Sequence, residues 1–196
     1  MTTSMKTIVW DIDDVLNNST KTWLENCWLP AHSGCTLKYE DITENPPHRL
    51  LGITREEYLR SLDEFRLSPL AGAMIPEKHL INWFRKNGSR FRHIALTARP
   101  RKTVSPAIEW MLLYFGEWFQ TFSFVPAERL GEAPGHPDHD KAGFLSWLGK
   151  VDYFIDDNHE NVKASRHLGI TAFLVSSPWN NSELTLRDIV ENELKK

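Results

Sequence analysis

Three short apolar segments of the chain each lead into side chains that could serve as nucleophiles, proton donors or metal ligands. They are residues 7–10 before Asp11 and Asp13, residues 93–96 before Thr97, and residues 151–155 before Asp156 and Asp157. Short runs rich in β-branched and aromatic residues predict buried strands. Because ligands bind beyond the carboxyl ends of the strands in an open parallel sheet, we expect these side chains to converge on one crevice.

The acidic residues favour a metal site at that crevice. Asp11 and Asp13 lie two apart, so they project to the same side near the end of a strand. Two carboxylates this close repel each other, and a cation or a proton must offset the repulsion. Mg²⁺ prefers oxygen ligands and also binds substrate phosphates, and Asp156 and Asp157 could complete its ligation. Alone, each acidic pair is also typical of a solvated loop, but two such pairs at strand ends predict a magnesium site.

The order and spacing of these segments resemble the motifs of the haloacid dehalogenase-like superfamily of phosphatases and phosphotransferases. The resemblance extends from about residue 6 to residue 175. The first and last motifs are specific, whereas the middle two carry weight only in this order. The matching segments are Asp11-Ile12-Asp13-Asp14-Val15-Leu16, Ile94-Ala95-Leu96-Thr97, Lys141 at a predicted helix start, and Tyr153-Phe154-Ile155-Asp156-Asp157.

The resemblance implies a role for each matching residue. Asp11 would attack phosphorus and form an aspartyl-phosphate. Asp13 would protonate the leaving group and then deprotonate the attacking water; since a dehalogenase needs no such acid, Asp13 favours a phosphate substrate. Thr97 and Lys141 would hold the phosphoryl oxygens. The implied Mg²⁺ ligands are Asp11, the main-chain carbonyl of Asp13, Asp157, and Asp156 either directly or through water.

Three residues next to the motifs have less certain roles. Arg99 is a candidate for binding the substrate phosphate or a second substrate anion, and a structural salt bridge is the alternative. Asn158 could orient the acidic pair or cap the following helix. Asp14 lies outside the pattern of catalytic residues, so we expect it to cap a helix or to face solvent.

The rest of the chain predicts an α/β fold, namely a three-layer Rossmann-like parallel sheet. Residues 121–125 and 171–175 are two further strand candidates. Strands that alternate with helices predict a parallel sheet covered on both faces. The helices are expected at residues 77–86, 105–115, 141–148, 159–168 and 183–194.

One segment interrupts the alternation and predicts a helical cap inserted after the first strand. It has helical character at residues 20–28 and 55–65, and Thr54 to Glu57 fits a capping box at the start of the second helix. A cap of this kind closes over small substrates and excludes bulk water. The predicted division is a cap of residues 17–75 and a catalytic core of residues 1–16 and 76–196.

The composition of the chain limits the kinds of partner that it can bind. The formal net charge is −3 with both signs scattered along the chain, whereas binding to a nucleic-acid polymer needs a concentrated basic face. No apolar run approaches the roughly 20 residues of a membrane span. The N-terminal residues lack the layout of a signal peptide, so we expect a cytoplasmic protein. Nothing in the sequence indicates an oligomeric state.

These observations predict a Mg²⁺-dependent phosphomonoester hydrolase that acts on a small phosphorylated metabolite. Deoxyribonucleotidase-like members of the superfamily resemble this chain in size, in the position of a helical cap and in a strand ending in Asp-Asp. A nucleoside monophosphate is therefore the first substrate to consider. Trp23 and Trp28 in the cap could stack on a base, although most tryptophans serve packing. The alternatives are a phosphotransferase of the same fold and a non-catalytic phospholigand-binding protein.

Overall fold

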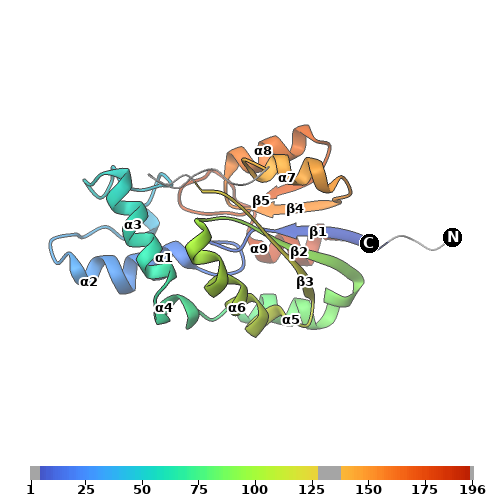
Figure 1. Cartoon of the computed structure of the whole chain (residues 1–196), viewed down its shortest axis with the longest axis horizontal. Helices are drawn as coiled ribbons and strands as arrows, with labels where there is room; N and C mark the ends of the chain where they lie inside the picture. Colours follow the sequence, from blue (N-terminus) through green and yellow to red (C-terminus); the bar gives the residue numbers. More distant parts are fainter. Residues whose placement is uncertain (1–4, 128–137, 195–196) are drawn as a thin grey trace.

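Runs of β-branched and aromatic residues form one five-stranded sheet in the computed structural model, which describes residues 5–127 and 138–194 (Figure 1). All five predicted strands are present. Their bounds are β1 Lys6–Trp10, β2 Phe91–Ala98, β3 Phe119–Val125, β4 Tyr153–Asp156 and β5 Thr171–Leu174.

The strands lie in the order β3-β2-β1-β4-β5, and every neighbouring pair is parallel. The central strand is β1, where Trp10 is level with Ala95 of β2 and with Ile155 of β4. Since all the strands run the same way, the residues that follow them emerge at one edge of the sheet. This arrangement confirms the predicted Rossmann-like parallel sheet.

Alternate residues of β1 pack into two separate hydrophobic clusters, because successive side chains of a strand point to opposite faces of the sheet. Ile8 and Trp10 join a cluster with the buried faces of α5 (Lys78–Asn87) and α6 (Val104–Phe115). Val9 joins a second cluster with α7 (Lys141–Leu148) and α8 (His159–His167) on the other face. The sheet is thus the middle of three layers, and helices cover both of its faces (Figure 1).

The covering helices overlap their predicted ranges closely. Gly169 follows α8 with a φ of 80°, a backbone conformation that ends a helix and that glycine adopts at little cost. Among residues 5–127 and 138–194, no helix combines the length and the apolar character of a membrane span. The helices are α5 Lys78–Asn87, α6 Val104–Phe115, α7 Lys141–Leu148, α8 His159–His167, and α9 Leu186–Asp188, which continues as a π-helical turn Ile189–Glu193.

A helical insert follows β1, as predicted, and it lies beyond the carboxyl ends of the strands (Figure 1). The predicted capping box starts the helix α3 (Arg55–Arg66): Thr54 Oγ1 accepts the Glu57 N–H at 3.2 Å, and the Glu57 carboxylate accepts the Thr54 N–H at 2.8 Å. The elements of the insert are α1 Ser19–Trp23, a π-helical turn Leu24–Trp28, α2 Leu29–Ala31, a 3-10 helical turn Tyr39–Asp41, α3 Arg55–Arg66 and α4 Pro69–Gly72.

The insert has a hydrophobic cluster of its own. Trp23 is fully buried in it, Tyr58 meets the Trp23 ring edge-on at 5.1 Å between centroids, and Trp28 lies 5.5 Å from Trp23. Both tryptophans therefore pack within the insert. The residue bounds that we give for the cap and the core stay a prediction.

Candidate active site

A pocket of about 160 Å³ lies at the carboxyl ends of the strands, with walls from both the sheet and the insert. The insert contributes Tyr58, Leu62 and Arg66 of α3, together with Ser19, Thr20 and Asn45. On the opposite side, the pocket brings together residues that are far apart in the sequence. The predicted site residues that line it are Asp11, Asp13, Thr97, Lys141 and Asp157.

Asp11 directly follows the carboxyl end of β1, and hydrogen bonds fix its position there. Its N–H donates to the Ile155 carbonyl at 2.9 Å, which extends the pairing of β1 and β4 one residue beyond the strand. Its Oδ1 accepts the Ile12 N–H at 2.7 Å, and its Oδ2 lies 2.7 Å from Lys141 Nζ. Burial raises the pKa of Asp11 to about 7 against the opposing charge of Lys141. A further cation beside Asp11 would favour the ionised form, which is the nucleophilic one.

Lys141 occupies the first position of α7, which Asp140 caps by accepting the Gly143 N–H at 2.7 Å. Its ammonium group is buried between Asp11 and Asp156, 2.7 Å from each carboxylate. Burial alone would lower the pKa of Lys141, but the two carboxylates raise it above its ordinary value. The pocket therefore contains a permanent positive charge next to Asp11.

Asp156 is fully buried beneath the pocket, and both of its oxygens accept hydrogen bonds. Oδ2 accepts from Lys141 at 2.7 Å, and Oδ1 accepts the Asn158 N–H at 2.8 Å. The Asn161 amide also donates to both oxygens, at 3.2 and 3.1 Å. Most of the hydrogen bonds that this carboxylate can accept are thus used to hold Lys141 and the start of α8.

Asp157 is held from the loop that follows β5. Its Oδ2 accepts the Trp179 indole N–H at 2.9 Å, and its carbonyl accepts from Asn180 at 2.9 Å. Burial, together with the charge of Asp156, raises the pKa of Asp157 well above its ordinary range.

The three carboxylates of Asp11, Asp156 and Asp157 could hold a metal ion. Each offers an oxygen, and these oxygens lie within 4.8 Å of one another. Three carboxylates against one ammonium group leave two negative charges when all are ionised, which a divalent cation would balance. Hard oxygen ligands are those that Mg²⁺ prefers. The residues present therefore fit the magnesium site implied by the sequence motifs.

Asp13 lies between two arginines. Arg99 Nη2 donates to its Oδ1 at 2.6 Å, and Arg66 Nη2 donates to its Oδ2 at 2.8 Å. Burial would raise the pKa of Asp13, but the two guanidinium groups hold it well below its usual range. Of the two roles considered for Arg99, the structure contains the salt bridge. Arg99 lines a smaller cavity that Asp13 also lines, and it does not line the pocket that contains Asp11 and Lys141. Binding of a substrate anion by Arg99 stays a prediction.

The two neighbouring polar residues serve local structure. Asn158 caps α8, since its Oδ1 accepts the N–H groups of Glu160 at 2.9 Å and Asn161 at 3.3 Å. It also contacts Asp156 through its own N–H, so it combines both of the roles considered for it. Asp14 has a φ of 60° and accepts the Thr20 N–H at 2.8 Å in the first turn of α1, which is a capping contact.

Several residues of the site are absent from the sequence motifs. Asn161 could have been found, because it lies three residues after Asn158 in the first turn of α8 and faces the same carboxylate. Arg66 and Trp179 lie 53 and 22 residues from their carboxylate partners. No local pattern marks either of them, so only the fold reveals their contacts.

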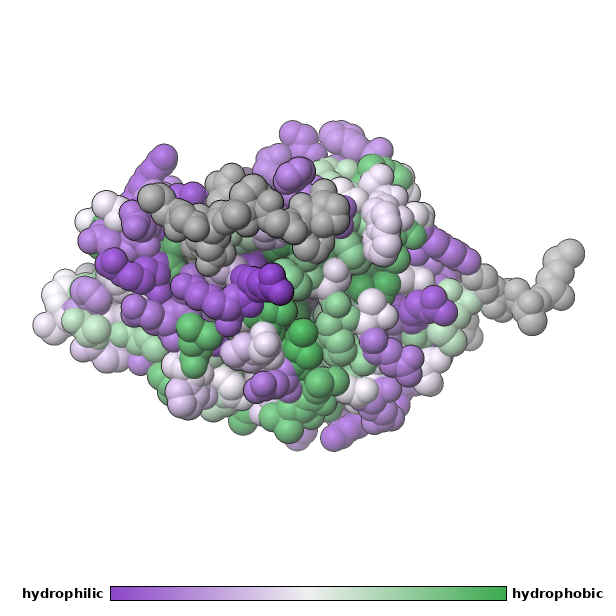
Figure 2. Space-filling view, viewed as in Figure 1, coloured by the Kyte–Doolittle hydropathy of each residue, from purple (hydrophilic) through white to green (hydrophobic). Residues whose placement is uncertain are grey.

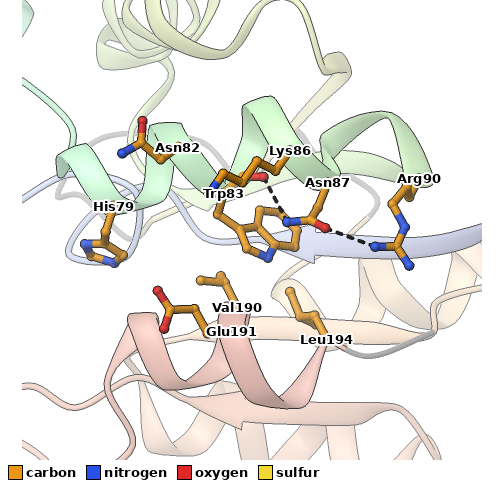
Figure 3. A pocket seen from close by; sticks show the side chains of 9 residues that line it. All are labelled: His79, Asn82, Trp83, Lys86, Asn87, Arg90, Val190, Glu191 and Leu194. Atoms are coloured by element: carbon orange, nitrogen blue, oxygen red, sulfur yellow. Dashed lines mark hydrogen bonds between the residues drawn. The ribbon is translucent and has the colours of Figure 1, made fainter.

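A larger groove of about 740 Å³ lies between α5 and the turn after α9 (Figure 3). It shares no lining residue with the carboxylate pocket. Its polar side chains partly satisfy one another, since Arg90 donates to Asn87 at 3.0 Å and Asn87 donates to the Trp83 carbonyl at 3.3 Å. The smaller pocket is the candidate active site, because it alone of the two contains the converging carboxylates and Lys141.

The sheet order and the helical insert after β1 form the Rossmann-like fold that is found in solved structures of haloacid dehalogenase-like hydrolases. Solved structures of other proteins share this fold. A Bacteroides fragilis protein named as a haloacid dehalogenase-like hydrolase matches with a TM-score of 0.61 and 14% identity, over 92% of this chain and 91% of its own.

Two further solved structures share the fold. A superfamily hydrolase of subfamily IA from Geobacter sulfurreducens matches with a TM-score of 0.51 and 16% identity over 95% of each chain. A Lactobacillus delbrueckii protein named as a phosphoglycolate phosphatase matches with a TM-score of 0.55 and 15% identity, over 95% of this chain and 92% of its own. No protein-family model and no curated protein matches the sequence. At these identities the likeness is one of fold.

Proposed function

We propose that this chain is a Mg²⁺-dependent phosphomonoester hydrolase that forms an aspartyl-phosphate on Asp11. The observation that carries the proposal is the buried pair of Asp11 and Lys141, 2.7 Å apart, in one pocket with Asp13, Thr97 and Asp157. Phosphoryl transfer depends mainly on positioning and on positive charge around the transferring group, and this pocket offers both. The fold that it shares with a protein named as a phosphatase adds support.

The side chains divide the work between two steps. In the first, an Asp11 oxygen bonds to phosphorus as the ester oxygen leaves and takes a proton from Asp13. Arg66 and Arg99 hold Asp13 ionised in this structure, so Asp13 must separate from at least one of them and bind a proton before this step. In the second, Asp13 takes a proton from a water that attacks the aspartyl-phosphate, which releases inorganic phosphate and restores Asp11. Lys141 and Thr97 hold the phosphoryl oxygens in both steps.

The metal would be held by Asp11, Asp157 and the main-chain carbonyl of Asp13, with Asp156 acting on it directly or through water. Bound Mg²⁺ would offset the carboxylate charges and neutralise charge on the phosphoryl oxygens. The bonds that already occupy both Asp156 oxygens favour the water-mediated arrangement for that residue.

The size of the pocket points to a small substrate. Its volume of about 160 Å³ is below the roughly 300–1,000 Å³ of pockets that enclose drug-sized ligands. A phosphoryl group with a short leaving group suits this space, whereas a nucleoside monophosphate would require the insert to move away from the sheet. The nucleoside monophosphates remain the first esters to assay, because the sequence resembles deoxyribonucleotidase-like proteins.

A panel of phosphate esters assayed with Mg²⁺ tests the proposal. It should contain nucleoside monophosphates, short phosphorylated acids and sugar phosphates, and release of inorganic phosphate is the readout. Addition of an alcohol acceptor separates hydrolysis from phosphotransfer, because a phosphotransferase would form a new ester in preference to phosphate. Binding of esters without turnover of any of them would identify a non-catalytic phospholigand-binding protein and would contradict the proposal.

A further inference from the structure

The loop between β5 and α9 supplies the side chain that holds one of the candidate metal ligands. The indole N–H of Trp179 donates to Asp157 Oδ2 at 2.9 Å. Within residues 5–127 and 138–194, no other side chain or main-chain group donates to this carboxylate. The Oδ1 atom is therefore left for another partner, on a residue that lines the catalytic pocket.

The loop that carries Trp179 is fixed by its neighbour Asn180. The Asn180 amide donates to the carbonyls of Asp157 at 2.9 Å and Val175 at 2.8 Å. Its Oδ1 accepts the N–H groups of Ser177 at 3.3 Å and Ser182 at 3.0 Å. Because these four bonds are independent of the Asp157 carboxylate, the loop sets the position of the indole and not the reverse.

The other side of the Trp179 ring contacts the insert. Tyr39 meets it edge-on, with 6.1 Å between ring centroids and 90° between the planes. Trp179 also packs against the hydrophobic cluster of the insert, which includes Trp23 and Tyr58. The indole is thus held by a loop of the core and by the insert, while its N–H points at Asp157.

We propose that Trp179 is a positioning residue for Mg²⁺, which fixes Asp157 so that Oδ1 is presented to the ion. This inference rests on the proposed function, because it assumes the magnesium site. A donor behind a metal-ligating carboxylate orients that ligand, and its loss typically costs 10–100-fold in metal affinity. An indole only donates, so Trp179 supports Asp157 without competing for the cation. Its contact with Tyr39 links that support to the placement of the insert.

The substitution Trp179→Phe tests the role, since it keeps an aromatic ring near Tyr39 and removes the N–H together with the pyrrole part of the indole. Trp147→Phe is the matched control, because Trp147 lies on α7 and is 73% exposed. Mg²⁺ affinity is measured by calorimetry on the full chain without substrate. We expect affinity to fall by about 10–100-fold in Trp179→Phe and to stay at the wild-type value in Trp147→Phe. In turnover assays, the Mg²⁺ concentration for half-maximal rate should rise by the same factor, while kcat at saturating Mg²⁺ stays close to wild type.

Two results would overturn the role of Trp179. One is an unchanged Mg²⁺ affinity in Trp179→Phe. The other is a fall in kcat at saturating Mg²⁺ without a shift in affinity, which would assign the residue to packing alone. Failure of the wild-type chain to bind Mg²⁺ would instead remove the magnesium site, and with it both the proposed function and this inference. The wild-type titration therefore separates the two failures.

Discussion

Arg66 of the insert donates to Asp13 at the mouth of the sheet across 2.8 Å. The same guanidinium group lies 3.6 Å from Asp63, and Lys102 of the core lies 3.4 Å from the other side of Asp63. Charges of alternating sign therefore run from the catalytic pocket through α3 and back to the core. The position of the insert and the surroundings of Asp13 are coupled through this chain of ion pairs.

Replacing Arg66 should destabilise the protein strongly. In Arg66→Met the buried Asp63 loses its arginine partner and Asp13 loses one of two, and removal of one partner from a buried ion pair typically costs about 3–5 kcal/mol. Arg60→Met is the matched control, because Arg60 lies on the same helix but is exposed, and such surface changes usually stay within about 0.5 kcal/mol. Urea unfolding of both variants measures the difference. Equal stabilities would show that the ion pairs to Arg66 contribute nothing.

Asp11→Asn should leave the fold intact and abolish turnover, because a neutral amide is a poor nucleophile. The Ile12 N–H and Lys141 contact different oxygens of Asp11, so the single amide oxygen can accept from only one of them; the backbone bond from Asp11 N–H to Ile155 is unaffected and keeps the residue in place. Release of phosphate is the assay, and a circular dichroism melt checks the fold. Glu117→Gln, a substitution of an exposed residue shortly after α6, serves as the control. Activity of more than a small fraction of the wild-type rate in Asp11→Asn would exclude Asp11 as the nucleophile.

Chelation should stop the reaction, and Mg²⁺ should restore it. Because a metal that binds only the native state stabilises it by RT ln(1 + [L]/Kd), Mg²⁺ at about 100 times its Kd should add about 2.7 kcal/mol to the free energy of unfolding. Asp157→Ala should greatly reduce both the stabilisation and the rate. Thermal melts with EDTA and with Mg²⁺ provide a readout that does not depend on knowing the substrate. Full activity in EDTA would contradict the site.

The sheet and the positions of the carboxylates could be predicted from the sequence because their signals are local. Residues 7–10 and 153–155 are apolar runs that end in acids, and such a run forms a buried strand wherever it lies. Once the strands are parallel, the geometry of the sheet alone brings Asp11 and Asp157 to the same edge. The capping box at Thr54 and the helix stop at Gly169 are likewise decided by a few neighbouring residues.

The contacts that tune those carboxylates could not be predicted, because they join segments with no sequence relation. Arg66 reaches Asp13 only after the insert has folded over the sheet. Trp179 reaches Asp157 only after Asn180 has shaped the loop that follows β5. The tryptophans of the insert show that composition alone does not predict the role of a side chain. The sequence allowed Trp23 and Trp28 to stack on a nucleotide base, whereas in the structure they pack in the small hydrophobic cluster of the insert.

His93 of β2 is buried next to Trp10, and its hydrogen bonds define its protonation. The Trp10 indole N–H donates to His93 Nδ1 at 3.0 Å, so that nitrogen carries no proton. Its Nε2 lies 2.9 Å from the Gly88 carbonyl, to which it must donate. Burial among aromatic rings lowers the pKa of His93 to about 4. The native protein therefore holds a neutral imidazole with the proton on Nε2.

This histidine should make the protein sensitive to mild acid. In the unfolded chain His93 titrates near its ordinary pKa of about 6.5, so between pH 6.5 and 4 the unfolded state binds the additional proton and stability falls as the pH is lowered. The stabilisation is complete above pH 6.5, and the loss at pH 5 should be about 2 kcal/mol. Urea unfolding at pH 7 and pH 5 measures it. His93→Gln, which keeps one donor and one acceptor, should lose this part of the pH dependence; an unchanged difference in the variant would assign it to other groups.

Asp13→Asn should slow alkyl esters far more than aryl esters. General acid–base assistance is typically worth about 10²–10⁴-fold, and an alkyl phosphate requires the proton that Asp13 supplies. An activated aryl phosphate leaves without that proton, so its first step should change much less. The second step loses its base with either ester, so aspartyl-phosphate should accumulate and a burst of aryl alcohol should precede slow turnover.

The geometry around Asp13 sets how this experiment is run and what would contradict it. The substitution leaves Arg66 and Arg99 facing a neutral amide, so the variant will be less stable, and its kinetics belong at a temperature well below its melting point. Rapid mixing with one aryl and one alkyl ester at saturating Mg²⁺ then compares the first steps directly. If the Asp13 side chain only placed the arginines or supported the metal, its loss would depress both esters alike and give no burst. Equal losses without a burst would therefore remove Asp13 from the proton transfers, whereas unequal losses with a burst would assign both transfers to it.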